Sequence, residues 1–185
     1  MNIIVLGGCG YIGSVLVNKL LNQNHKILVI DTQWFGNYLK PHKKLKIIKN
    51  DIRNLKNIKF RGYDSIIHLA NIANDPASEL NPNLSWEVNV LSTYQLVEKA
   101  INEGVKKFIY SSSGSVYGIK KERKVTEDLP PYPISIYNKT KMIAERILLS
   151  FRDKIDIKII RPATVCGLSS RMRLDVSVNP LIAKR

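Results

Sequence analysis

Short apolar runs rich in β-branched residues alternate with longer stretches whose apolar residues have helical spacing. The six short runs are 2–6, 26–30, 45–49, 65–70, 107–110 and 157–160. Runs of this length and composition are typical of buried strands. The clearest helical stretches are 14–21, 83–103 and 135–152, the second of which ends before Gly104. Strands that alternate with helices predict an α/β fold, a doubly wound parallel sheet with helices on both faces.

A glycine-rich turn joins the first strand to the first helix. Gly7, Gly10 and Gly13 are spaced three residues apart in this turn. In such a turn the first glycine permits the tight bend, the second lets a pyrophosphate approach the backbone, and the third lets the helix pack closely on the strand. The free N–H groups at the start of the helix then face the phosphates. The pattern predicts a Rossmann fold that binds a dinucleotide; a glycine turn that binds no nucleotide is the alternative.

An acidic residue, Asp31, ends the second strand, near the offset of about 20 residues expected after the glycines. A carboxylate there accepts hydrogen bonds from the ribose hydroxyls and repels a 2′-phosphate, so it favours NAD over NADP. Polar or small residues also follow the C-terminal ends of all six predicted strands: Gly7, Asp31, Asp51, Ala70, Ser111 and Arg161. Because ligands of an open parallel sheet bind outside these ends, we expect the site at this edge.

The composition is ordinary except for its charge. The 185 residues suffice for one core, and 44% of them are hydrophobic. No apolar run approaches the roughly 20 residues that span a bilayer, and a strand starts at once, so we expect no membrane segment and no signal peptide. Two cysteines predict no disulfide framework, which favours the reducing cytoplasm. The net charge of +14 is spread along the chain, which indicates a solvated basic surface; a nucleic-acid site is the alternative.

Tyr137 and Lys141 are four residues apart, so their side chains lie on one face of the predicted helix. The pKa of a free tyrosine is about 10, too high for a base at neutral pH. A nearby ammonium and a positive nicotinamide ring both favour the phenolate. Tyr137 is then able to take the proton from a sugar or alcohol hydroxyl while hydride leaves the same carbon. A serine hydroxyl from the 111–118 segment would hold the substrate oxygen.

These motifs together resemble the extended short-chain dehydrogenase/reductases, which include the nucleotide-sugar epimerases and dehydratases. The resemblance covers nearly the whole chain and rests on 7–14, Asp31, 51–53, 68–70, Asn89, 111–118, 137–141 and 161–162. It implies that Ser113, Tyr137 and Lys141 are catalytic, and it implies no metal. The NAD contacts that it implies are Gly7, Gly10, Tyr11, Ile12, Gly13, Asp31, Asp51, Ile52, Leu69, Ala70, Asn89, Tyr137 and Lys141. Asp51 and Ile52 are expected at the adenine, and Asn89 is expected to support the lysine.

Two departures from the family pattern narrow the function. The 4,6-dehydratases carry an Asp-Glu pair after the catalytic Ser or Thr, whereas this chain has Gly114 and Ser115. The family also has a C-terminal lobe that encloses the nucleotide-sugar, and this chain stops near its start. We therefore expect an NAD-binding domain at 1–165 and an incomplete substrate-binding extension at 166–185, with Ser113, Arg171 and Asn179 as candidate substrate contacts.

The resemblance favours a nucleotide-sugar 4-epimerase that acts through a transient 4-keto sugar on a UDP-, GDP- or dTDP-hexose. A reductase of 4-keto sugars that consumes NAD(P)H is the nearest alternative. An NAD- or RNA-binding protein without catalysis is the alternative of another class. By the same resemblance the helices at 83–103 and 135–152 pair across a two-fold axis, which implies a homodimer, although burial inside the monomer explains their apolar residues as well.

Overall fold

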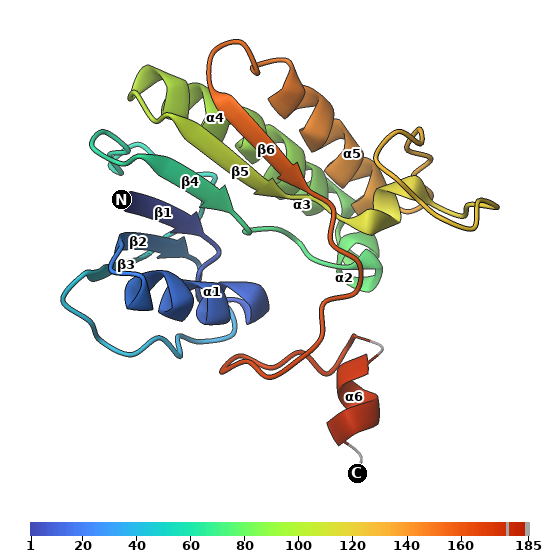
Figure 1. Cartoon of the computed structure of the whole chain (residues 1–185), viewed down its shortest axis with the longest axis horizontal. Coiled ribbons are helices and arrows are strands. Elements are labelled where there is room, and N and C mark those ends of the chain that lie inside the picture. Colours follow the sequence, from blue (N-terminus) through green and yellow to red (C-terminus); the bar gives the residue numbers. More distant parts are fainter. Residues whose placement is uncertain (177, 184–185) are drawn as a thin grey trace.

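A single parallel sheet of six strands runs through the molecule in the order β3-β2-β1-β4-β5-β6 (Figure 1). The computed structural model describes residues 1–176 and 178–183. The strands are β1 (Asn2–Leu6), β2 (Lys26–Asp31), β3 (Leu45–Lys49), β4 (Ser65–His68), β5 (Lys107–Ser111) and β6 (Asp156–Ile160). This order confirms the predicted doubly wound fold. The connections run in opposite directions from β1, so the strand ends on either side of β1 leave a crevice of the kind that binds dinucleotides.

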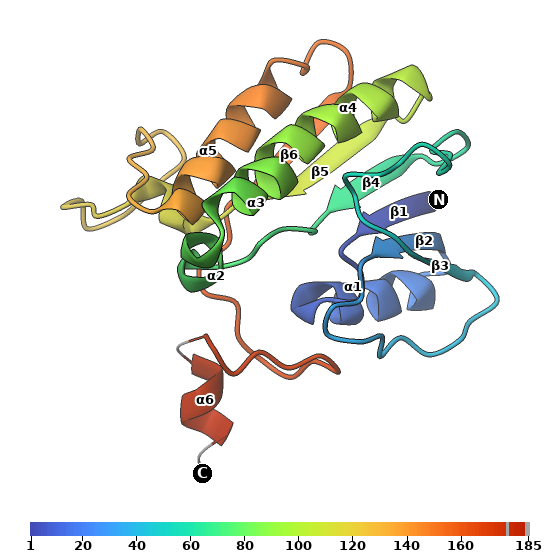
Figure 2. The same cartoon turned by 180° about the vertical axis from the view of Figure 1, so that it is seen from behind.

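Alternate residues of the central strand belong to two different cores, because successive side chains of a strand point to opposite faces. Ile3 and Val5 of β1 pack in one apolar cluster with Val17 and Leu21 of α1 (Tyr11–Asn22). Ile4 and Leu6 pack in a second cluster, to which α4 (Ser92–Asn102) and α5 (Ile136–Leu149) contribute Leu96, Val97, Ala100, Ala144 and Leu148. The helices therefore cover both faces, and α4 lies beside α5 (Figure 2).

The helix predicted at 83–103 is present but is interrupted by a wider turn. It consists of α3 (Pro82–Trp86), a π-helical turn (Glu87–Leu91) and α4. Such turns are rare and occur often at functional sites. The hydrophobic spacing did not indicate it, and the turn contains Asn89. Three further short elements were also not predicted: α2 (Asp75–Leu80), a 3₁₀ turn (Gly114–Tyr117) and α6 (Val178–Ala183).

The chain beyond β6 leaves the sheet, passes α2 and turns along the start of α1 before α6 (Val178–Ala183) (Figure 1). Tyr11 Oη donates to the Gly167 carbonyl at 2.7 Å, and the hydroxyls of Ser14 and Ser169 lie 2.8 Å apart. These bonds hold the segment against the glycine turn. Among the helices of residues 1–176 and 178–183, we find no span with both the length and the apolar character that a bilayer crossing needs.

Candidate active site

The glycine turn lies at the C-terminal end of β1, against the end of β4. Gly7 has a φ of +81°, and a Cβ at this position would lie 2.6 Å from the Ala70 backbone nitrogen. Only glycine fits this backbone and this close approach. The Gly7 N–H donates to the Ile30 carbonyl at 2.9 Å, which ties the turn to β2 as well. Leu69 and Ala70, expected beside the cofactor, therefore form one wall of the turn through their backbone.

Gly13 and Gly10 have different surroundings. A Cβ on Gly13 would lie 2.4 Å from the Gly7 carbonyl oxygen, so Gly13 permits the close packing of α1 on the turn. A Cβ on Gly10 would meet only that same oxygen, at 3.3 Å, and is otherwise directed into open space. The first turn of α1 has neither an acidic residue nor a side-chain cap. Its N–H groups are thus available to an anion, so the turn fits a pyrophosphate.

Asp31 is bound to the same turn. Its Oδ2 accepts from the Cys9 N–H at 2.9 Å, and its Oδ1 accepts from the Gln33 N–H at 2.7 Å. Asp51 forms an ion pair with Arg53, with 2.8 Å between Oδ2 and Nη2. Hydrogen bonding from Arg53 is the main cause that lowers the pKa of the Asp51 carboxyl. The side chain of Ile52 is buried in the larger core. Contact of Asp51 and Ile52 with an adenine stays a prediction.

Lys141 is almost completely buried on α5, with 2% of its surface exposed. Its Nζ donates to the Ser111 carbonyl at 2.6 Å and lies 4.7 Å from the centre of the Tyr110 ring and 5.8 Å from that of Tyr137. Burial lowers the pKa of Lys141 from 10.5 to about 7, against the opposing charge of Glu145. The predicted meeting of Tyr137 and Lys141 at the end of β5 is therefore present.

Burial is also the main influence on Tyr137 and raises the pKa of its phenol. A hydrogen bond with Ser113 and the charge of Arg173 act in the opposite direction. The sequence led us to expect a lowered pKa from the neighbouring ammonium. In the chain without cofactor, the effect of burial on the Tyr137 pKa is larger than the effects of Ser113 and Arg173, so the pKa is raised. Arg173 itself is bound to Asp175, with 2.5 Å between Nη2 and Oδ2.

Ser113 caps the 3₁₀ turn that follows β5. Its Oγ accepts from the Ser115 N–H at 3.2 Å and lies 2.7 Å from the Ser115 hydroxyl. The Gly114 N–H donates to the Pro162 carbonyl at 2.8 Å, which joins this turn to the chain after β6. Ser113 is thus held at the start of the turn that Gly114 and Ser115 begin.

Asn89 is fully buried and joins three parts of the chain from the π-helical turn. Its amide accepts from the Ile72 N–H at 2.8 Å and donates to the Ile72 carbonyl at 3.1 Å. It also donates to the Thr140 hydroxyl at 3.0 Å, next to Lys141 along α5. Asn89 thus braces α5 beside the lysine without touching its ammonium.

Two of the three candidate substrate contacts lie in the segment after β6. The Arg171 guanidinium stacks 3.9 Å from the centre of the Phe35 ring. Asn179 is 3% exposed, and its amide bonds to Gly167, Tyr11 and Arg173. No local sequence pattern predicted these contacts of Arg171 and Asn179. A substrate that bound Asn179 would have to share its amide with Gly167, Tyr11 and Arg173.

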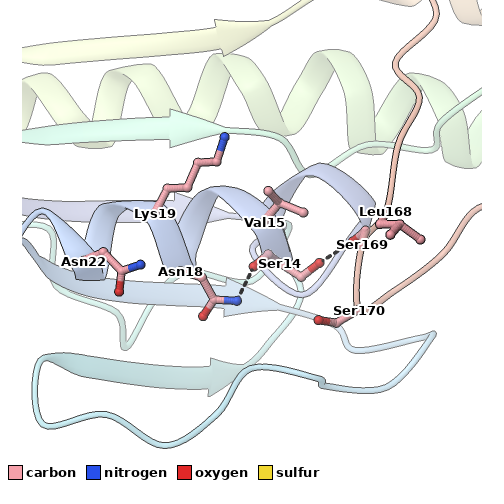
Figure 3. A pocket seen from close by; sticks show the side chains of 8 residues that line it. All are labelled: Ser14, Val15, Asn18, Lys19, Asn22, Leu168, Ser169 and Ser170. Carbon is pink, nitrogen blue, oxygen red and sulfur yellow. Dashed lines mark hydrogen bonds between the residues drawn. The ribbon is translucent and has the colours of Figure 1, made fainter.

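A cavity of about 380 Å³ lies between α1 and the 168–170 segment (Figure 3). Ser14 is one of its lining residues, bonded through its carbonyl to Asn18 and through its hydroxyl to Ser169. A second cavity of about 260 Å³ shares Val15, Lys19, Leu168 and Ser169 with it and extends to Tyr11 and Gly167. Neither is lined by Ser113, Tyr137 or Lys141, so both are separate from the tyrosine–lysine pair.

The fold and the glycine turn define a Rossmann-fold protein of the dinucleotide-binding type. The chain belongs to the NAD dependent epimerase/dehydratase family, whose model matches residues 3–185. It is 34% identical to the UDP-glucose 4-epimerase of Lactobacillus helveticus over 177 residues, which cover 92% of this chain and 53% of that protein. The chain spans about half the length of the curated relatives it matches.

Solved structures agree with this assignment. A UDP-N-acetylglucosamine 4-epimerase from Methanobrevibacter ruminantium M1, in complex with UDP-N-acetylmuramic acid, superposes with a TM-score of 0.87 at 31% identity, over 96% of this chain and 59% of that one. MoeE5, in complex with UDP-glucuronic acid and NAD, superposes with a TM-score of 0.85 at 29% identity, over 95% of this chain and 58% of its own. The predictions of the family, of an enzyme fold of this family and of NAD as its cofactor are confirmed.

Proposed function

We propose that this chain carries the catalytic part of an NAD-dependent nucleotide-sugar 4-epimerase that acts through a transient 4-keto sugar. The observation that carries the proposal is the pairing of buried Lys141 with Tyr137 at the carboxyl end of the sheet, where Ser113 interacts with the Tyr137 phenol. A UDP-hexose is the first substrate to test, since the relatives described above are named for UDP-sugars.

The residues that would hold NAD are those of the glycine turn and Asp31. Gly10 leaves room for the pyrophosphate, and the start of α1 offers N–H donors to it. Asp31, already oriented by the Cys9 and Gln33 N–H groups, has a carboxylate for the ribose hydroxyls. When bound, NAD supplies reversible hydride transfer at the sugar C4 carbon.

Proton transfer falls to Tyr137. Its phenolate would accept the proton of the 4-hydroxyl as the carbon is oxidised, and the phenol would return a proton when the ketone is reduced on its other face. The Lys141 ammonium stabilises the phenolate by its charge, and Ser113 holds the substrate oxygen. Each group ends the cycle in the protonation state in which it began.

Elimination of water needs an additional acid and base near the sugar, and positions 114 and 115 of the 3₁₀ turn offer neither. Gly114 and Ser115, where the dehydratases carry carboxylic acids, have no ionisable group. The charge of Asp75 raises the pKa of Tyr137, and the Asp75 carboxylate accepts a hydrogen bond from the Ser135 hydroxyl. An epimerase needs only the serine, the tyrosine and the lysine, so the residues present fit that reaction better.

We also propose a homodimer in the cytoplasm. The outer sides of the paired helices carry exposed apolar side chains, among them Leu91, Tyr94 and Leu149, and two-fold pairing of α4 and α5 would cover them. Both cysteines are free, which suits a reducing compartment. Multi-angle light scattering of the purified chain is expected to give twice the mass of one chain, and a single-chain mass would contradict the dimer.

The function is tested by incubating the chain with NAD and UDP-glucose, then separately with GDP- and dTDP-hexoses. We expect interconversion of the C4 epimers without net accumulation of NADH. Stoichiometric NADH would indicate a dehydrogenase, and turnover of a 4-keto sugar only with added NAD(P)H would indicate a reductase. Binding of RNA that weakens steeply with salt, with no turnover of any sugar, would favour the non-catalytic alternative.

A further inference from the structure

Four polar side chains from four parts of the chain meet one helical turn beyond Lys141. Glu145 of α5 is 2% exposed, and its carboxylate accepts a fork of hydrogen bonds from Arg161, at 3.0 Å from Nε to Oε1 and 2.6 Å from Nη2 to Oε2. The Ser112 hydroxyl also donates to Glu145 Oε1. Arg161 Nη1 in turn donates to Tyr117 Oη at 2.6 Å. Each of these four side chains thus has a hydrogen-bond partner within the cluster.

The cluster joins α5 to both loops that form the tyrosine–lysine site. Ser112 lies between Ser111, whose carbonyl accepts from Lys141, and Ser113, which interacts with Tyr137. Arg161 follows β6 directly, and the Ser112 N–H donates to the Ile160 carbonyl at 2.8 Å. A displacement of Glu145 would therefore move the Ser111 carbonyl and α5 relative to each other.

Stability alone gives little reason for such a pair. Taking two charges out of water costs about as much as their attraction returns, and apolar side chains of similar volume often serve as well. Removal of one partner, by contrast, leaves a buried charge without compensation. A bidentate pair with a buried carboxylate, beside Lys141, therefore points to a role in the site.

We infer that Glu145 is a positioning residue that, anchored by Arg161 and Ser112, holds Lys141 against the Ser111 carbonyl and beside Tyr137. The inference rests on the proposed function in taking Tyr137 as the base that Lys141 assists. Glu145 itself touches neither Tyr137 nor the expected position of a substrate, so it acts through Lys141.

The groups around Lys141 explain why the charge of Glu145 matters. β5 contributes the Tyr110 ring and the Ser111 carbonyl, α5 contributes Tyr137, and β4 contributes His68. Burial raises the pKa of Tyr110 well above its usual value, and burial with the Lys141 charge lowers the pKa of His68 to about 3, so both are neutral at pH 7. Among these neighbours Glu145 carries the negative charge, which opposes the loss of the lysine proton.

The test is a pH titration of Lys141 in the chain without cofactor. NMR of ¹³C-labelled lysine side chains records the titration, and the Lys141 signal is identified by its absence from the spectrum of Lys141→Met. In Glu145→Gln we expect the titration midpoint to fall by about one pH unit. Glu79→Gln, on the exposed surface of α2, removes the same charge elsewhere and should leave the midpoint unchanged. Circular dichroism checks that each variant is folded.

A second variant, Glu145→Gln with Arg161→Gln, removes both charges while two amides can still bond to each other. It should recover melting temperature lost in Glu145→Gln, and its Lys141 midpoint should lie between those of Glu145→Gln and the wild type. An unchanged midpoint in the folded variants would overturn the inference, and so would failure of both to fold, since the pair would then be purely structural. Because no substrate is used, absence of epimerase turnover would reject the proposed function without affecting this result.

Discussion

The Nζ of Lys141 lies 5.8 Å from the centre of the Tyr137 ring, and the two residues are one turn apart on the same helix. Lys141 is buried and Tyr137 is half-buried, and burial shifts their pKa values in opposite directions, up for the phenol and down for the ammonium. Each shift disfavours the charged form of its group.

Tyr137→Phe removes the phenolic oxygen while it keeps the ring in place. We expect epimerase turnover to fall by about 10² to 10⁴, the usual contribution of a general base, with NAD affinity nearly unchanged. Steady-state kinetics with UDP-glucose and calorimetric titration with NAD measure the two effects. Tyr132→Phe is the control, because that side chain is 72% exposed. Retention of full turnover by the Tyr137 variant would refute its catalytic role.

Lys141→Met should reveal the cost of the buried charge as a dependence of stability on pH. Below pH 7 the lysine is charged in the folded and the unfolded chain, so the folded wild type bears the full cost of burial. Between pH 7 and 10.5 the unfolded chain still holds the proton and the folded chain does not, so wild-type stability rises relative to that of the variant. The advantage of the methionine variant should therefore be largest below pH 7 and shrink by a few kcal/mol towards pH 10.

Urea denaturation at several pH values, with Lys139→Met as the control, measures this difference. Lys139 is exposed on the same helix, so its substitution should give no comparable slope. A difference in unfolding free energy between Lys141→Met and wild type that stays constant from pH 6 to pH 10 would mean that the lysine keeps its proton throughout this range when folded.

Gly10→Ala and Gly13→Ala should separate cofactor binding from folding. The Gly10 backbone suits alanine, with φ at −76°, and its Cβ would meet only the Gly7 carbonyl oxygen, so unfolding free energy should change by less than about 1 kcal/mol. The same Cβ would occupy space left for a pyrophosphate, so NAD affinity should fall at least about tenfold, or 1.4 kcal/mol.

A Cβ on Gly13 would instead lie 2.4 Å from the Gly7 carbonyl oxygen, and this overlap should cost about 1–3 kcal/mol of stability. Thermal denaturation and NAD titration of the two variants side by side provide the comparison. Unimpaired NAD binding by Gly10→Ala would show that the pyrophosphate does not approach this residue.

Asn89→Leu should destabilise the chain, since it leaves the Ile72 peptide groups and the Thr140 hydroxyl without their buried partner. We expect a loss of roughly 2 kcal/mol or more in unfolding free energy, measured by urea denaturation. Asn83→Leu, exposed on the same long helix, should change it by no more than about 0.5 kcal/mol. Equal effects of the two substitutions would contradict the bracing role of Asn89.

The features predicted correctly from sequence are those encoded over a few residues. A strand, three glycines and a helix specify the glycine turn, because backbone conformation and steric fit are local properties. The spacing of Tyr137 and Lys141 likewise places both on one face of α5, since helical geometry alone determines this. The role of Asn89 in supporting the lysine was implied by resemblance, whereas the π-helical turn that presents it was not indicated by any spacing.

The sequence by itself determined the sheet, its helices and the edge at which the polar strand ends gather, because hydrophobic period and glycine sterics act at short range. Only the tertiary structure decided the ion pair of Glu145 with Arg161, the stacking of Arg171 on Phe35 and the upward shift of the Tyr137 pKa. These features depend on how deeply side chains from distant segments are removed from water. The free energy of a charge varies with that burial far more than with its neighbours along the chain.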